Sequence, residues 1–362
     1  MERRPHLAQE LTDHIIGFLR DSPSDWPACA LVSRSWVYAA QAHIFRRMYF
    51  LSSDGATDER RWARFLEFST KSPGLIRHVR QIGITIVGGR MSTETFLAIC
   101  AFPFTRLDGV WLILMRPRPS EIPAAQQLLS RSTLRRVRLV CSEPSAFFQI
   151  WDRCSATVAH VNVYYSTYGT QSTERFSPSQ PVAAPIRLES LDLSTVGECL
   201  RDWLMHPFCP LDFSCLKTVS IGSDIDILQS HKFTSARQTI ETLYLEPSPL
   251  SPILDLSSFP ALQVLRMHPG GAWRWVYVTL STITVSSRIR KIIINDYLDI
   301  TTHEVFDAQL SRLPISPIIE FEMHPPYYTS MISCLPLLRS KNTLRCAEED
   351  PEWFSNLTGM PI

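Results

Sequence analysis

The sequence predicts an α/β protein in two parts: a small module of three helices, followed by a long region in which strands and helices alternate and the strands form a parallel sheet. A short apolar motif recurs along most of the chain at regular spacing. The N-terminal segment instead shows the apolar periodicity of amphipathic helices. With 362 residues the chain is long enough for both parts.

The recurring motif is an apolar residue followed three and five positions later by two further apolar residues. It begins at Val79, Leu107, Leu134, Val158, Leu188, Leu216, Ile240, Leu262, Ile289 and Ile318, with a degenerate copy at Leu344. Successive copies start about 26 residues apart, and alternation within each copy predicts a strand. Several intervals, such as STETFLAICAF and IPAAQQLLSRS, predict helices. A non-repeating α/β domain with parallel strands is the alternative.

This region resembles the leucine-rich-repeat family over roughly residues 79 to 350. The family commonly has Asn or Cys three residues after the last apolar position, where this chain has, for example, Met115, Ser248 and Gly270. The turns between copies are therefore expected to be irregular. The resemblance implies an α/β solenoid that covers residues 79–362 and binds a protein substrate.

Strand alternation predicts which side chains such a sheet offers to a partner. The third, fifth and seventh motif positions point away from the core. Tryptophan, tyrosine and arginine contribute most to binding at protein interfaces. The predicted substrate-binding residues are therefore Trp111, Arg138, Tyr164, Tyr244 and Arg266, and the aromatic residues of this face are expected to be exposed. The alternative is an ordinary solvated sheet face, which also carries such residues.

Three short helices are expected before the repeats. In LAQELTDHIIGFL the residues Leu7, Leu11, Ile15 and Leu19 recur every four positions. A turn at Trp26-Pro27 precedes a short helical piece, and Ser33 or Ser35 is a candidate cap for a third helix through Trp36, Ala40 and Ile44. A module of this size buries little surface and is expected to need a partner, unless it only caps the first repeat.

These helices resemble the F-box family. The matching residues are Leu7, Glu10-Leu11, Ile15-Ile16 and Leu19, followed by Cys29-Ala30-Leu31-Val32-Ser33-Arg34-Ser35-Trp36. Ala8 stands where the family usually has proline. The predicted organisation is an F-box domain over 1–50, a helical linker or cap over 51–78, and the repeat domain. This layout is common in mushroom-forming fungi of the basidiomycete type.

The resemblance implies a non-catalytic subunit of a Skp-cullin-F-box ubiquitin ligase. The F-box would bind the Skp adaptor, and through it cullin, with contacts drawn from Leu7, Glu10, Leu11, Ile15, Ile16, Leu31, Val32 and Trp36. These residues divide between holding the helices together and facing the adaptor. The repeats would hold an unknown protein substrate. The alternative is a repeat scaffold that binds a protein partner without ubiquitin transfer.

Composition and motifs give no support to other classes of function. The net charge of +1 does not favour nucleic-acid binding, and no apolar run is long enough for a membrane span. No Gly-x-Ser-x-Gly, His-Glu-x-x-His or phosphate-binding glycine loop occurs, so we expect no catalytic residues, metal or cofactor. Nine cysteines without a Cys-x-x-Cys pair and the lack of a signal-peptide pattern favour the cytoplasm or nucleus.

Overall fold

The structure is a computed structural model, and it describes residues 9–18, 23–50, 55–86, 91–165, 185–195, 198–295, 303–322, 331, 333–341 and 343–347. The chain divides into two compact units. The first comprises Met1–Val137 and Gln149–Ser155, and the second comprises Arg138–Phe148 and Ala156–Ile362. Each unit is described by itself.

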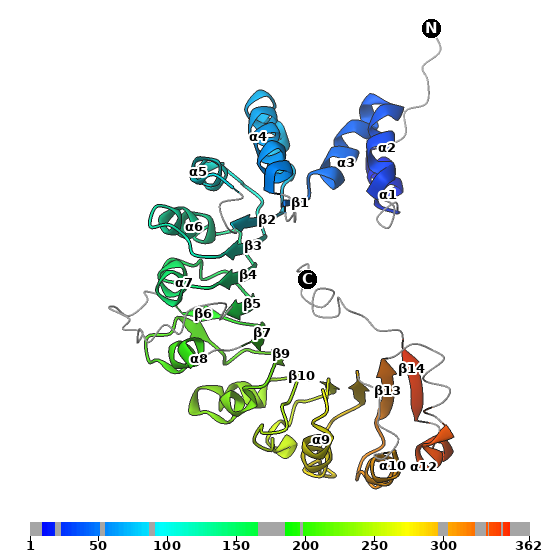
Figure 1. Cartoon of the computed structure of the whole chain (residues 1–362). Coiled ribbons are helices and arrows are strands. Elements are labelled where there is room, and N and C mark those ends of the chain that lie inside the picture. Colours follow the sequence, from blue (N-terminus) through cyan, green and yellow to red (C-terminus); the bar gives the residue numbers. More distant parts are fainter. Residues whose placement is uncertain are drawn as a thin grey trace. The chain divides into compact units, whose positions relative to one another are not determined.

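The first unit begins with helices and continues with strands that alternate with helices (Figure 1). The elements of the first unit, where η denotes a 3-10 helix, are α1 (Gln9–Phe18), η2 (Pro23–Asp25), α2 (Trp26–Val32), α3 (Arg34–Ile44), β1 (Arg47–Phe50), α4 (Gly55–Lys71), η3 (Pro73–His78), β2 (Gln81–Ile86), α5 (Thr93–Ala101), β3 (Gly109–Leu114) and α6 (Glu121–Leu129). The three expected N-terminal helices are therefore present as α1, α2 and α3.

The boundary between the units passes through β4 (Arg136–Cys141) and α7 (Pro144–Trp151). The second unit contains β5 (His160–Tyr165), β6 (Ile186–Arg187), β7 (Ser190–Thr195), α8 (Glu198–Met205), β8 (Leu211–Asp212), β9 (Thr218–Ile221), η4 (Ile225–Gln229), η5 (His231–Phe233), η6 (Ala236–Gln238), β10 (Thr242–Leu245), η7 (Leu256–Ser258), β11 (Val264–Met267), α9 (Trp273–Leu280), β12 (Lys291–Ile294), α10 (His303–Ser311), β13 (Ile318–Glu322), α12 (Pro336–Ser340) and β14 (Leu344–Ala347).

Within the described residues, twelve strands form a sheet in the order β1-β2-β3-β4-β5-β7-β9-β10-β11-β12-β13-β14, and β6 pairs with β8 separately. The pairings resolved within each unit are parallel, for example β2 with β3 and β10 with β11. Parallel neighbours require a crossover connection, which the intervening helices and 3-10 turns provide. The predicted α/β class with a parallel sheet is confirmed.

The predicted motif copies coincide with the strands. Nine strands, from β2 to β12 without β6 and β8, begin two residues after the first motif position, as β2 does after Val79. The frame is wrong in the last two copies. Ile318 pairs with Lys291, and Leu344 pairs with Ile319, so these copies begin at Ser316 and Lys341. The shift of the last copy, from Leu344 to Lys341, changes which side chains of β14 belong to the core face.

The sequence interpretation missed one strand of the twelve-stranded sheet, β1, and the two short strands β6 and β8. β1 pairs with β2 in parallel, with Arg47 beside Gln81, although it lies within the range 1–50 predicted as the F-box domain. Its segment FRRMYF has the same apolar spacing, with Phe45 as first and Met48 as fourth position. The range 51–78 contains α4 and η3, and its role as a linker or cap stays a prediction.

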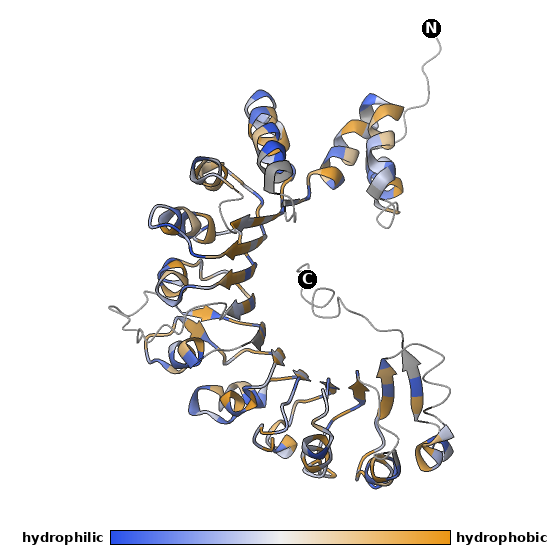
Figure 2. Ribbon diagram, viewed as in Figure 1, coloured by the Kyte–Doolittle hydropathy of each residue, from blue (hydrophilic) through white to orange (hydrophobic). Residues whose placement is uncertain are grey.

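The core lies between the sheet and the helices that return from one strand to the next. In the nine copies that begin at Val79 through Ile289, the first, fourth and sixth motif positions are buried, for example Val79, Ile82 and Ile84 in the copy of β2. Figure 2 shows the apolar colouring along these strands. At the turns, backbone N–H groups donate to the preceding strand, such as Met115 to Ile86 and Glu246 to Ile221, both at 2.9 Å. These bonds satisfy the two N–H groups that directly follow β3 and β10.

Candidate protein-binding surfaces

The three N-terminal helices pack around a small apolar core of their own. Ile16, Cys29, Ala39 and Ala40 are buried in it, and Trp26, Ala30, Trp36 and Ile44 pack against them. The ring of Tyr38 on α3 lies edge-on to His78, with 4.8 Å between ring centroids, and the Arg77 guanidinium lies 5.2 Å from the Tyr38 ring centroid. These contacts attach α3 to η3 within the first unit.

Other apolar side chains of these helices are exposed to solvent. Leu31 is 88% exposed, and Leu11, Ile15, Phe18 and Val32 are exposed as well. Burial of such a side chain is worth about 1.5–3 kcal/mol, which the free chain does not gain at these positions. Exposed apolar groups concentrated in so small a module are typical of a protein-interaction surface.

The structure separates the residues predicted to bind the adaptor. Those on the surface are Glu10, Leu11, Ile15, Leu31 and Val32. Ile16 is completely buried and Trp36 packs against the core, so these two residues hold the helices together and the predicted surface contact through Ile16 is not available. Leu7 lies outside the described residues. Phe18 was not among the predicted contacts, although it belongs to the same apolar stripe.

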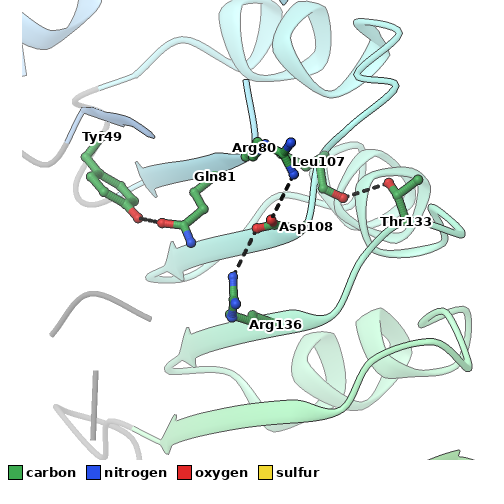
Figure 3. Close-up of polar contacts among 7 residues, drawn as sticks. All are labelled: Tyr49, Arg80, Gln81, Leu107, Asp108, Thr133 and Arg136. Atoms are coloured by element: carbon green, nitrogen blue, oxygen red, sulfur yellow. Dashed lines mark hydrogen bonds and ion pairs between the residues drawn. The ribbon is translucent and has the colours of Figure 1, made fainter. Parts of the chain in front are cut away.

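In the first unit, an aromatic pair covers the side of the sheet that faces away from the helices. The Tyr49 ring lies above Gly83, where a Cβ atom would collide with it. It meets Trp111 edge-on at 5.9 Å between ring centroids, and its hydroxyl donates to Gln81 Oε1 at 2.8 Å (Figure 3). Burial raises the pKa of Tyr49 to about 12. Glycine at position 83 is therefore what allows Tyr49 to approach Trp111.

A charged group lies beside this pair, at the start of the strands. Figure 3 shows the Asp108 carboxylate between Arg80 and Arg136, at 3.9 and 3.2 Å from their Nη1 atoms. The Thr133 hydroxyl donates to the carbonyl oxygen of Leu107 at 2.7 Å. Neighbouring motif copies are thus joined by side chains that immediately precede or begin the strands. The sequence interpretation missed Asp108 because it considered only the third, fifth and seventh positions.

In the second unit, polar side chains on the equivalent side of the sheet bind each other across the strands. Asn162 donates to Asp192 Oδ2 at 2.6 Å, and both side chains are buried. Burial lowers the pKa of Arg138, an effect that the Asp192 carboxylate opposes. Tyr164 is half-buried at the end of β5. Arg138, Asn162 and Asp192, on β4, β5 and β7, thus interact across this part of the sheet face.

A second network covers β10 to β13. The Arg266 guanidinium lies 5.6 Å from the centroid of the Tyr244 ring and forms an ion pair with Glu322, two strands away. The Tyr244 hydroxyl donates to Glu246 Oε1 at 2.7 Å, and burial raises the pKa of Tyr244. Arg266 and Glu322 are only 4% and 6% exposed. Each charge is therefore compensated within the sheet face.

The five predicted substrate-binding residues lie on the expected side of their strands, but the prediction that the aromatics are exposed is wrong. Trp111, Tyr244 and Arg266 are buried, and Arg138 and Tyr164 are half-buried. Adjacent strands are about 4.8 Å apart, so long side chains at equivalent positions lie flat over their neighbours and remove each other from water. Whether these residues bind a substrate stays a prediction.

The described residues hold no group of three or more histidine, cysteine, aspartate or glutamate side chains that is arranged for a metal ion. Burial raises the pKa of the thiols of Cys100 and Cys154, and raises those of Cys141 and Cys209 to about 11. These thiols are protonated at neutral pH and poorly nucleophilic. No described helix is both long and apolar enough to cross a membrane.

Comparison with known proteins gives no family. No protein-family model matches the chain, and no curated protein matches it.

Proposed function

We propose that this chain is the substrate-recognition subunit of a Skp-cullin-F-box ubiquitin ligase, with an N-terminal F-box that docks on the Skp adaptor and a leucine-rich-repeat-like solenoid that holds a protein substrate. The observation that carries the proposal is the exposed apolar surface of α1 and α2, formed by Leu11, Ile15, Leu31 and Val32. These residues lie in the two segments that resemble the F-box family.

The energetics of the N-terminal helices support docking on another protein. Their own core consists of four buried residues, two of which are alanines. Cores of this size give little stability without a partner, a metal or disulfides. A partner that covers the exposed leucines and valine would add their apolar area to the area that the helices bury among themselves. The chain would act by proximity, holding a substrate lysine near a ubiquitin-charged enzyme brought by other subunits.

The test is a pull-down of the full chain with purified Skp adaptor, followed by a titration. Leu31→Asp together with Val32→Asp introduces two charges into the proposed interface and is expected to weaken binding by at least about a hundredfold. The matched control is Leu250→Asp, because Leu250 is 94% exposed in the second unit and Leu31 is 88% exposed. The control variant is expected to bind like the unmodified chain.

Circular dichroism of both variants checks that the helices remain folded. If the unmodified chain does not bind the adaptor, or if the double variant binds as well as the control, the ligase proposal is wrong. A non-catalytic scaffold that binds a protein partner without ubiquitin transfer is then the function to pursue.

A further inference from the structure

A groove lies within the first unit between α4 and the segment that joins α3 to β1. Its volume is about 500 Å³, which is within the range of ligand-binding sites. Its lining residues are Phe45, Met48, Arg61, Arg64, Phe65, Glu67, Phe68 and Lys71. None of them belongs to the apolar surface of α1 and α2 or to the polar networks of the sheet.

The groove exists because the motif copy of β1, which begins at Phe45, has an incompletely buried core. Phe45 and Met48 occupy the first and fourth motif positions, yet both are only half-buried. The corresponding residues of the next copy, Val79 and Ile82, are fully buried. α4 covers the first copy with Phe65, whereas Phe68 one turn later remains 45% exposed. An apolar layer that the copies beginning at Val79 through Ile289 complete is thus left open here.

The floor of the groove is aromatic, and its rings contact one another and a buried tryptophan. The rings of Phe45 and Phe68 are stacked, with 6.1 Å between centroids and an interplanar angle of 23°. Phe65 is held in place by an edge-on contact with the buried Trp62, at 5.8 Å between centroids. A preformed apolar floor needs little reorganisation to accept an apolar side chain, which favours binding.

The rim of the groove is cationic. Arg61, Arg64 and Lys71 line it together with a single acidic residue, Glu67, and all four residues are exposed. Lys71 and Glu67 form an ion pair at 2.6 Å. Three of the four charged lining residues are cations, so the lining carries more positive than negative charge. Guanidinium groups bind carboxylates in a bidentate manner.

We propose that this groove binds a short acidic amphipathic segment of a partner protein. The segment would place leucine or aromatic side chains on the floor formed by Phe45, Met48 and Phe68, and carboxylates beside Arg61 and Arg64. The lining residues of α4 run from Arg61 to Lys71, about 15 Å along the helix, which matches roughly three turns of a docked helix. Because the site combines an apolar floor with a cationic rim, a peptide that has both apolar and acidic side chains fits it better than a nucleic acid or a fatty acyl chain.

The test uses the full chain and a fluorescein-labelled helical peptide with Leu at positions i, i+3, i+4 and i+7 and Glu elsewhere. Binding is measured by fluorescence anisotropy. We expect Arg64→Glu and Phe68→Ser each to raise the Kd by about tenfold or more. The matched controls are Arg312→Glu, at an exposed arginine, and Phe208→Ser, at a phenylalanine that is 42% exposed, both in the second unit. Both controls are expected to leave the Kd unchanged.

Three further probes identify the occupant. The proposal is overturned if a peptide with Lys in place of Glu, an oligo-glutamate without leucine, or an anionic phospholipid vesicle binds as tightly as the amphipathic peptide. Hydrogen exchange of the unmodified chain gives a readout that does not depend on the variants folding. Peptide-induced protection at residues 45–48 and 61–71 supports the proposal, and protection confined to other segments overturns it. The result is independent of adaptor docking, because Leu31 and Val32 do not line the groove.

Discussion

The N-terminal helices and the sheet face of the second unit carry candidate binding residues in opposite states. On α1 and α2, Leu11, Leu31 and Val32 are exposed and are not covered by the chain's own core. On β10 to β13, Tyr244, Arg266 and Glu322 are buried against one another. The first region thus leaves apolar surface in water, while the second has already compensated its charges.

This difference shows that residue type alone does not indicate an interaction surface. Arginine and tyrosine are enriched at binding hot spots. In this sheet, however, their partners are provided by neighbouring motif copies, so a substrate would gain less from them unless it replaced those contacts. Leucine and valine at exposed helical positions have no such internal compensation. The comparison therefore gives more weight to the N-terminal helices as a docking surface.

The largest expected effect tests whether the buried charges on the sheet face compensate one another. Glu322→Gln removes the charge that pairs with buried Arg266, and we expect the free energy of unfolding to fall by about 3–5 kcal/mol. The double variant Arg266→Met/Glu322→Leu removes both charges and is expected to be considerably more stable than the single variant. Urea unfolding monitored by circular dichroism measures both. Equal destabilisation by the single and double variants would contradict internal compensation by this pair.

The next effect tests whether the N-terminal apolar residues divide into core residues and surface residues. Ile16→Ala creates a cavity in the small core and should destabilise the helices by about 2–5 kcal/mol, the usual cost of such a truncation. Leu31→Ala at the surface should change stability by no more than about 0.5 kcal/mol. Hydrogen exchange of α1 to α3 reports the local stability. Similar losses for both variants would mean that Leu31 also belongs to the core.

The smallest effect concerns pH at the attachment of α3. Burial lowers the pKa of His78 from its ordinary value, as do the nearby positive charges of Arg77 and Arg106, and its ring contacts Tyr38 on α3. The unfolded chain then takes up the proton more readily than the folded chain. The stabilising contribution of neutral His78 is therefore present at neutral pH and is lost as the pH falls through the lowered pKa. We expect hydrogen exchange of α3, corrected for its intrinsic pH dependence, to show lower protection at about pH 5 than at about pH 7.

The variant His78→Gln removes this titration while keeping a polar side chain. Its protection factors in α3 should depend less on pH than those of the unmodified chain. The same pH slope in both proteins would assign the effect to another group.

The strands could be predicted from apolar spacing because their core positions depend only on nearby sequence. Nine strands follow the predicted frame without a shift. In SPIIEFEM the apolar spacing favours the frame that begins at Ile318, but the pairing of Ile318 with Lys291 requires a frame that begins at the polar Ser316. β1 has the motif too, but it directly follows a helical segment and was assigned to the N-terminal module. Local pattern thus identifies strands better than it fixes their register.

Exposure at the candidate sites could not be predicted in the same way. The burial of Arg266 depends on Glu322, which is 56 residues away in sequence and two strands away in the sheet. The separation of buried Ile16 from exposed Ile15 and Leu31 depends on how three short helices cross, which a broad apolar stripe leaves open. The groove beside α4 depends on a mismatch in coverage between two motif copies.

β1 has a practical consequence for dividing the chain. Only Phe45 and Arg46 separate the end of α3 from this strand, so a cut after residue 50, chosen to isolate the N-terminal helices, would remove a sheet strand with them. The remaining fragment would begin its sheet with β2, whose Ile82 and Ile84 are fully buried in the whole chain and whose backbone would lose its partner. Such an unprotected apolar edge promotes self-association. A separation of the two parts is therefore better made between Ile44 and Arg47, which leaves β1 on the fragment that contains the sheet.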